Sequence, residues 1–140
     1  MDRRSRLLFL LLIAAQTAHS IEEYCTRLFD RLAPARAVSE AIGFDRPTGF
    51  VIANTALIGF GLWCYLARVR PGRGAARGLA WFWAVLETAN GLAHAGLALA
   101  AGGYFPGLAT APLLLALGLG LAWSLAAASS KQDCGSPKTG

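Results

Sequence analysis

Apolar residues gather in four long runs along the chain, separated by short segments that contain Pro, Gly and charged residues. The runs cover residues 7–29, 49–67, 78–101 and 108–128. Each run has about the 20 residues that a helix needs to cross a hydrocarbon core of roughly 30 Å. The pattern therefore predicts an all-α membrane protein, a four-helix transmembrane bundle that forms a single domain over residues 1–128.

The segments between the runs predict how the helices are connected. Residues 68–77 have the pattern of a basic Pro/Gly loop, and residues 101–107 that of a tight uncharged turn. In the longest connection, residues 35–42 have the pattern of a short amphipathic helix at a membrane surface. Residues 129–140, with their Ser, Gly, Pro and Lys, predict a disordered cytoplasmic tail.

The composition narrows the class of protein. Of the residues, 55% are hydrophobic and 15% are charged, whereas a soluble domain has about 25% charged residues. This hydrophobic content excludes a disordered chain, and three cysteines at scattered positions argue against a disulfide scaffold. The net charge of +5 lies in the connecting segments, so no nucleic-acid-binding module is indicated.

The positions of Lys and Arg predict the orientation in the membrane. If four helices cross, most of the 13 basic residues fall on the side of the N-terminus, the second loop and the C-terminal tail. They are Arg3, Arg4, Arg6, Arg68, Arg70, Arg73, Arg77, Lys131 and Lys138. The positive-inside rule therefore predicts that both termini lie in the cytoplasm.

The N-terminus also allows a second interpretation. The arginines within residues 3–6, the apolar run and the string Ala18-His19-Ser20 resemble a signal peptide with its cleavage site. However, the helical pattern continues through Tyr24 and Phe29, and cleavage would separate the polar residues described next. We therefore favour an uncleaved first span.

Several polar side chains lie inside the predicted spans, where such residues are rare and usually face the interior of the bundle. They are His19, Glu22, Glu23, Asn54, Glu87, Asn90 and His94. An ionised acid near the bilayer centre costs roughly 2.5–3.5 kcal/mol. Protonation, pairing with the histidines, water or a bound metal cation must reduce this cost.

Helical spacing predicts that these side chains meet. His19 is followed at three and four residues by the two glutamates, so the three lie on one side of the first helix. Glu87, Asn90 and His94 have the same spacing and form a polar stripe on the third run. Counted along the helices, all these groups can share one layer in the outer half of the membrane.

The residue types predict one intramembrane site. The predicted catalytic residues, which are also the predicted metal ligands, are His19, Glu22, Glu23, Glu87 and His94. Asn54, Asn90 and Tyr104 are predicted to orient a substrate. Two histidines and carboxylates on facing helices suit a divalent metal ion such as zinc or iron. Without a metal, a neutral glutamate could donate a proton and a histidine could accept one.

Two sets of residues resemble those of the HXXEE family of small membrane proteins. One is His19-Ser20-Ile21-Glu22-Glu23. The other combines Glu87-x-x-Asn90-x-x-x-His94 with Tyr104-Phe105-Pro106-Gly107-Leu108-x-Thr110-Ala111. The resemblance spans about residues 12–115. It implies a multi-spanning membrane protein of bacterial type, hence one of the bacterial plasma membrane, and it implies no settled activity.

Three functions fit these observations. The leading hypothesis is a membrane-embedded enzyme, metal-dependent or acid–base, that acts on a membrane lipid or another lipophilic small molecule. A proton-coupled carrier is the second, although four spans without a repeat would need a homodimer for alternating access. The third is a structural or regulatory subunit, in which the polar cluster holds the helices together. As separate alternatives, Asn54 could join helices without binding a ligand, and His19 with the two glutamates could lie at a helix end in interfacial water.

Overall fold

The computed structural model describes residues 1–42 and 45–133, with side chains described as far as residue 129. Every regular element in these residues is a helix, which confirms the all-helical fold. The α-helices are α1 (Arg3–Cys25), α2 (Leu28–Arg31), α3 (Ala33–Ile42), α4 (Arg46–Cys64), α5 (Ala76–Ala100) and α6 (Ala111–Asp133). The π-helix η1 (Tyr65–Val69) continues α4.

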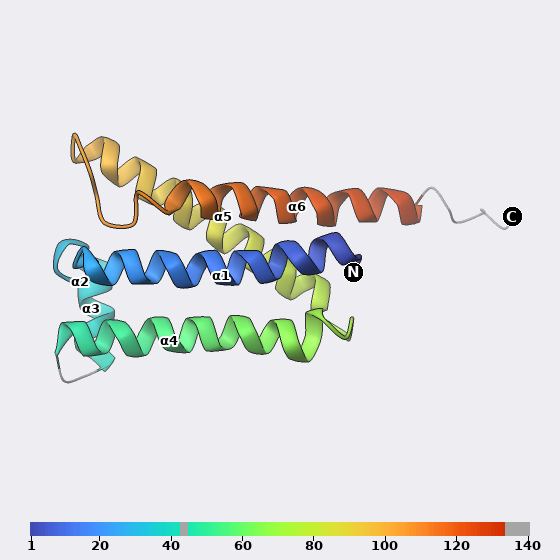
Figure 1. The fold of residues 1–140 in the computed structure, drawn as a ribbon, viewed down its shortest axis with the longest axis horizontal. Helices are drawn as coiled ribbons and strands as arrows, with labels where there is room; N and C mark the ends of the chain where they lie inside the picture. Colours follow the sequence, from blue (N-terminus) through green and yellow to red (C-terminus); the bar gives the residue numbers. More distant parts are fainter. Residues whose placement is uncertain (43–44, 134–140) are drawn as a thin grey trace, which may run out of the picture.

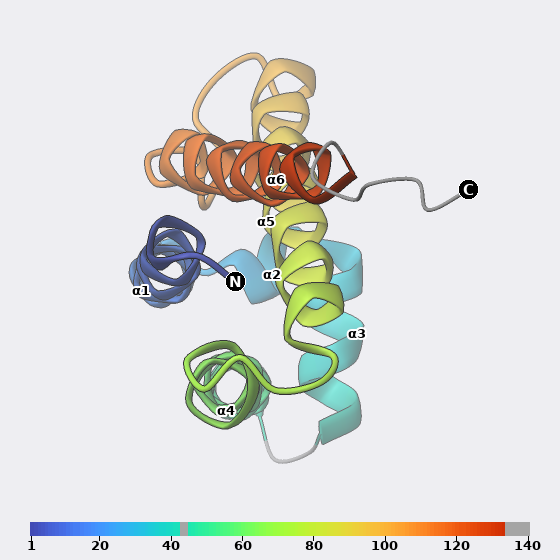
Figure 2. The same ribbon diagram turned by 90° about the vertical axis from the view of Figure 1, so that its right-hand side faces the viewer.

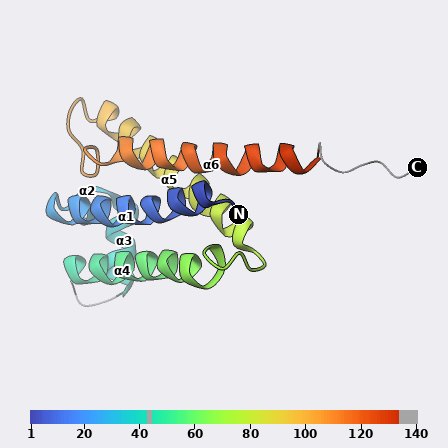
Figure 3. The same cartoon turned by 45° about the vertical axis from the view of Figure 1, so that its right-hand side comes forward.

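The other three long helices pack around α1. Helices α4, α1 and α6 lie side by side, with α1 in the middle, and α5 crosses behind α1 from the end of α4 towards the turn before α6 (Figure 1). The view in Figure 2 shows how α5 spans this layer, and Figure 3 shows the same order from an intermediate angle. Helices α1 and α5 run in one direction and α4 and α6 in the other, so α6 ends near the level where α1 begins.

Helix α1 is shorter than its apolar run. It ends at Cys25, so the prediction of a helix through Phe29 is wrong. Arg27 takes up a left-handed conformation with φ of 59°, and the chain turns there into the short helix α2. The turn allows Leu28 and Phe29 to pack against Phe50 of α4 in a small second apolar cluster.

Helix α3 lies across one end of the bundle, between α2 and the start of α4 (Figure 2). It is the amphipathic helix expected over residues 35–42, and it begins slightly earlier, at Ala33. Pro34 fits there because the first turn of a helix needs no N–H donor. The helix approaches α4 closely at Gly49, where a Cβ atom would lie 2.0 Å from the carbonyl oxygen of Ser39.

The predicted fourth span differs from α6 at both ends. The helix begins at Ala111 and not at Leu108. Residues 106–110 form a turn instead, and Gly107 has a φ of 89° in it. It continues to Asp133, so the disordered tail predicted from Ser129 is wrong for its first residues. The rest of that predicted tail, from residue 134, lies outside the described residues. The other two spans match α4 with η1 and α5 to within a few residues.

Two segments are long and apolar enough to cross a membrane. They are Arg46–Val69, which comprises α4 and η1, and Ala111–Ser129 in α6. Helices α1 and α5 have similar lengths, but they do not meet the same combined criterion of length, hydropathy and charge. By length and hydropathy, two of the four predicted spans are therefore candidate membrane spans.

The buried residues divide the bundle into an apolar and a polar part. Large apolar side chains from α1, α5 and α6 fill the part near the start of α1; among them are Phe9, Leu12, Trp83 and Leu121. Towards the end of α1, the buried side chains include ionisable groups: His19, Glu23, Glu87 and His94. This second part contains the candidate site.

Charged side chains tie together the helices at the end of the bundle where α2 and α3 lie. Asp30 accepts hydrogen bonds from Arg27 and Arg46, and Arg46 also donates one to Glu40 of α3. Desolvation acts to raise the pKa of Asp30, but the hydrogen bonds and positive charges of the two arginines outweigh it and lower the pKa. The carboxylate therefore remains ionised at neutral pH and joins α2 to the start of α4.

Replacement of Gly49 by alanine should separate α3 from α4. The new Cβ would meet backbone atoms of Ser39, which cannot rotate away, so we expect the free energy of unfolding to fall by about 1–3 kcal/mol. Gly59→Ala, in the same helix, is the control, because nothing lies within 4 Å of its Cβ position. Thermal unfolding of both variants in detergent tests this, and equal melting temperatures would contradict it.

Candidate metal centre

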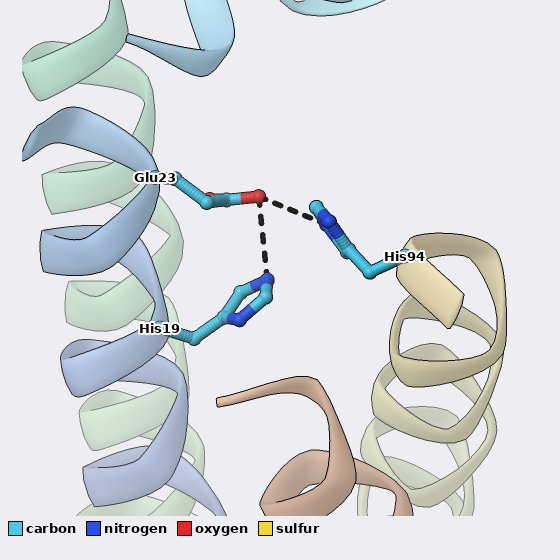
Figure 4. Close-up of side chains that lie close together, drawn as sticks. All are labelled: His19, Glu23 and His94. Carbon is cyan, nitrogen blue, oxygen red and sulfur yellow. Dashed lines mark ion pairs between the residues drawn. The ribbon is translucent and has the colours of Figure 1, made fainter. Parts of the chain in front are cut away.

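Three buried side chains from α1 and α5 converge on one point (Figure 4). His19 and Glu23 are four residues apart and face the same side of α1, and His94 comes from α5. Oε1 of Glu23 lies 3.3 Å from Nε2 of His19 and 3.1 Å from Nε2 of His94. The three potential ligand atoms lie within 4.8 Å of one another, and all three residues are buried. We call this group the His–Glu–His centre.

Hydrogen bonds on the outer side of each ring determine which nitrogen carries a proton. Nδ1 of His94 lies 2.6 Å from the carbonyl oxygen of Pro106, which can only accept, so this nitrogen is the donor. Nδ1 of His19 lies 2.7 Å from Oγ1 of Thr110. That hydroxyl donates its own hydrogen to Glu22, so it accepts from His19. In the neutral rings, both Nε2 atoms therefore present lone pairs to Glu23.

This arrangement requires positive charge between the three side chains. Two imidazole lone pairs and a carboxylate oxygen repel one another at these distances unless a proton or a metal cation lies among them. Two histidines and one carboxylate are the ligand set of catalytic zinc sites and of non-haem iron sites. Metal-bound histidines also commonly donate their second N–H to a carbonyl or another outer partner. The centre has the donor atoms for a metal ion and the outer hydrogen bonds that such a site uses.

Glu22 does not join the His–Glu–His centre. Its carboxylate accepts hydrogen bonds from the Tyr104 hydroxyl, from the backbone N–H groups of Ala109 and Thr110, and from the Thr110 hydroxyl. These partners belong to the turn before α6, residues 101–110. The two N–H groups lie immediately before the first residue of that helix, where a negative charge is favourable. Glu22 therefore holds the turn against α1, and Tyr104 contributes to this contact.

Gly107 allows the turn to approach both histidines. A Cβ atom at this position would lie 2.5 Å from Nδ1 of His94 and 2.8 Å from Cε1 of His19. The positive φ of this residue also favours glycine. The backbone of the turn thus packs directly on the two imidazole rings and closes one side of the centre.

Asn54 of α4 connects to α1 through hydrogen bonds. Gln16 Nε2 donates to the Ser20 hydroxyl, which donates to Oδ1 of Asn54, and Nδ2 of Asn54 donates to the carbonyl of Phe50. Asn54 therefore links two helices, as expected for an amide inside a helical bundle. It also lies at the edge of a cavity.

A cavity of about 300 Å³ adjoins the His–Glu–His centre at Glu23. Its polar lining comes from Gln16, Glu23, Ser39, Asn54 and Asn90, and apolar side chains of α2, α3 and α4 line the rest. The two asparagines that we expected to orient a substrate both border this cavity. The structure thus places the acidic member of the centre at a space in which a small ligand can bind.

Glu87 is a buried acid outside the His–Glu–His centre, although it lies near enough to Glu23 for the two charges to interact. It is 1% exposed, and neither carboxyl oxygen has a hydrogen bond of normal geometry within the described residues. Asn90, one helical turn further along α5, lies beside this carboxyl group. Glu87 therefore faces the interior of the bundle, but it is not part of the group that could hold a single metal ion.

The site therefore agrees with the prediction in part. The structure brings together three of the five predicted ligands, and it assigns Glu22 and Glu87 to other surroundings. The sequence reasoning gave no role to Thr110, to the Pro106 carbonyl or to Gly107, which orient and enclose the histidines. The Pro106-Gly107 pair does predict a turn at this position, but no local pattern in the sequence indicates that the turn packs against α1.

Comparison with protein families agrees with the resemblance noted from the residues. The family model described as "Protein of unknown function with HXXEE motif" matches residues 10–121. The chain belongs to the HXXEE family. No curated protein and no solved structure matches it. All three residues that define the HXXEE motif, His19, Glu22 and Glu23, lie where α1 meets α5 and the turn before α6.

Glu22→Gln should loosen the turn before α6. The amide NH₂ group cannot accept the hydrogen bonds that one carboxylate oxygen now accepts, so we expect a loss of about 2 kcal/mol in unfolding free energy. Glu40→Gln is the matched control, because Glu40 is exposed and bonds only to Arg46 among the described residues. Thermal unfolding in detergent measures both, and a smaller effect for Glu22→Gln than for Glu40→Gln would contradict this role.

Proposed function

We propose that this HXXEE protein is an integral membrane enzyme of the bacterial plasma membrane. In this proposal, the His–Glu–His centre binds one divalent metal ion, zinc or iron, and the adjoining cavity binds a lipophilic substrate. One observation carries the proposal: two imidazole Nε2 lone pairs converge on one buried carboxylate, while hydrogen bonds hold the opposite nitrogen of each ring.

The distribution of side chains supports a membrane location for all four long helices. Large apolar side chains are exposed on each of them, whereas ionisable side chains are buried inside. Examples of the exposed groups are Ile21 on α1, Trp63 on α4, Leu99 on α5 and Trp123 on α6. Such an apolar exterior around a polar interior is stable in a bilayer and unfavourable in water. The antiparallel order of the long helices is compatible with four crossings.

The charges at the two ends support the orientation with both termini in the cytoplasm. At the end with α2 and α3, Arg27 and Arg46 pair with Asp30 and Glu40. At the opposite end, the arginines of residues 3–6 and 68–77 have Asp2 as the only acid near them in the sequence. The larger number of arginines at this end favours the cytoplasmic side.

A bound metal ion would act as a Lewis acid or lower the pKa of a bound water molecule. Of the chain's own residues, His19, Glu23 and His94 would hold the ion, and Thr110 would keep His19 in the orientation that it needs. Asn54 and Asn90 would orient a substrate in the cavity that they line. Glu87, buried beside Asn90, is suited to accept or donate a proton.

The proposed topology predicts which positions are accessible from outside the cell. In a variant without the native cysteines, we expect Ala37→Cys in α3 to react with a membrane-impermeant maleimide on spheroplasts, and Gly74→Cys to react only after lysis. Both positions are exposed on the protein, so burial would not explain a difference. The reverse labelling pattern would contradict the proposed orientation, and equal labelling of both positions on intact spheroplasts would contradict a membrane span between them.

The metal content of purified protein tests the proposed centre. After loading with Zn²⁺, or with Fe²⁺ without oxygen, the wild type should retain about one ion per chain. Loss of an outer hydrogen-bond partner lowers metal affinity roughly 10–100-fold. His94→Ala removes a ligand itself, so it should lower the affinity by more than that. Glu87→Gln is the control, since this buried acid lies outside the centre, and it should retain the ion. Equal content near zero in the wild type and in His94→Ala would overturn the metal-dependent proposal.

A further inference from the structure

We propose that the cavity beside Glu23 binds a single-chain lipid of the alcohol class, whose head group donates a hydrogen bond. This inference names the substrate class of the proposed enzyme and therefore rests on the proposed function. It depends on two features of the cavity: the direction of a series of hydrogen bonds between α4 and α1, and the position of the apolar side chains.

The hydrogen-bond chain between α4 and α1 has only one direction. The Phe50 carbonyl can only accept, so Asn54 must turn its NH₂ group towards that carbonyl and its oxygen towards Ser20. The Ser20 hydroxyl must then donate to Asn54 and accept from the NH₂ group of Gln16. One N–H of each amide group and the hydroxyl hydrogen of Ser20 are used within this series of hydrogen bonds.

This series of hydrogen bonds leaves one acceptor free, the side-chain oxygen of Gln16. Oε1 of Gln16 is buried and has no hydrogen-bond partner within the described part of the chain, although the residue is only 2% exposed. A buried acceptor without a partner is costly, so a ligand that donates a hydrogen bond here gains binding energy. Glu23 and Gln16 both line the cavity, so a hydroxyl hydrogen meets acceptors at this end.

The remainder of the cavity suits a hydrocarbon chain. Apolar side chains line it on the side of α3 and α4, among them Val38, Ala53 and Leu57. At about 300 Å³, the cavity is at the small end of ligand pockets, so it holds the head and part of one chain and not a two-chain lipid. The ligand would lie with its hydroxyl near Glu23 and its chain between these two helices.

Photo-crosslinking with two matched competitors tests the inference. The probe is dodecanol with a diazirine on its chain, added to the metal-loaded full-length protein in nanodiscs, and mass spectrometry locates the crosslinks. We expect labelled peptides from α3 and α4, and displacement by unmodified dodecanol. Dodecyl methyl ether, which cannot donate, should compete about tenfold more weakly, as expected for one lost hydrogen bond.

Variants show whether the probe labels the cavity or the lipid-exposed surface of the protein. Gln16→Leu removes the free acceptor at similar size, and Ala53→Trp fills the cavity, so both should lower labelling about tenfold or more. Ile52→Trp is the matched control, because Ile52 faces outward on the same helix. Equal competition by the ether, or labelling unaffected by both cavity variants, would overturn the inference.

Metal content measured on the same samples keeps the two proposals apart. Normal metal content with equal competition by dodecanol and its methyl ether would overturn the substrate class and leave the metal centre supported. The expected labelling pattern with no metal in the wild type would support the ligand class and overturn the metal centre. The thermal unfolding of each variant shows whether a loss of labelling comes from misfolding.

Discussion

The carboxylate of Glu22 is the group on which the geometry of the centre depends, because it holds a turn that has no regular structure. This turn supplies the outer hydrogen-bond partners of both histidines, the Pro106 carbonyl and the Thr110 hydroxyl. An ionised carboxylate can accept four hydrogen bonds at once, and Glu22 accepts them from Tyr104 and the start of α6. Since Thr110 bonds to both Glu22 and His19, the same carboxylate also sets the orientation of a histidine ring.

The two adjacent glutamates of the HXXEE motif have different roles because successive residues of a helix point in different directions. Glu23 lies one turn after His19 and faces α5, where it meets His94. Glu22 faces the turn before α6. The motif therefore combines a pair of side chains in the centre with the group that fastens the turn enclosing it.

The long helices and the short helix α3 were predictable from the sequence to within a few residues, because apolar periodicity and turn-forming residues are local signals. The errors lie at helix ends. Phe29 has an apolar pattern that would continue α1, and Leu108 one that would begin α6. The chain turns at Arg27 and Gly107 instead, where left-handed conformations allow contacts with Phe50 and with the histidines. Those contacts join residues that are distant in sequence.

The sequence by itself determined that the chain is helical, that its polar side chains belong in the interior, and which residue types could form a site. Only the tertiary structure decided which of them meet. Spacing placed Glu22 and Glu23 equally near His19, but the rotation of α1 against α5 brings Glu23 to His94 and turns Glu22 towards Thr110. Helix rotation and the path of a turn depend on packing between distant segments, and local sequence patterns do not encode that packing directly.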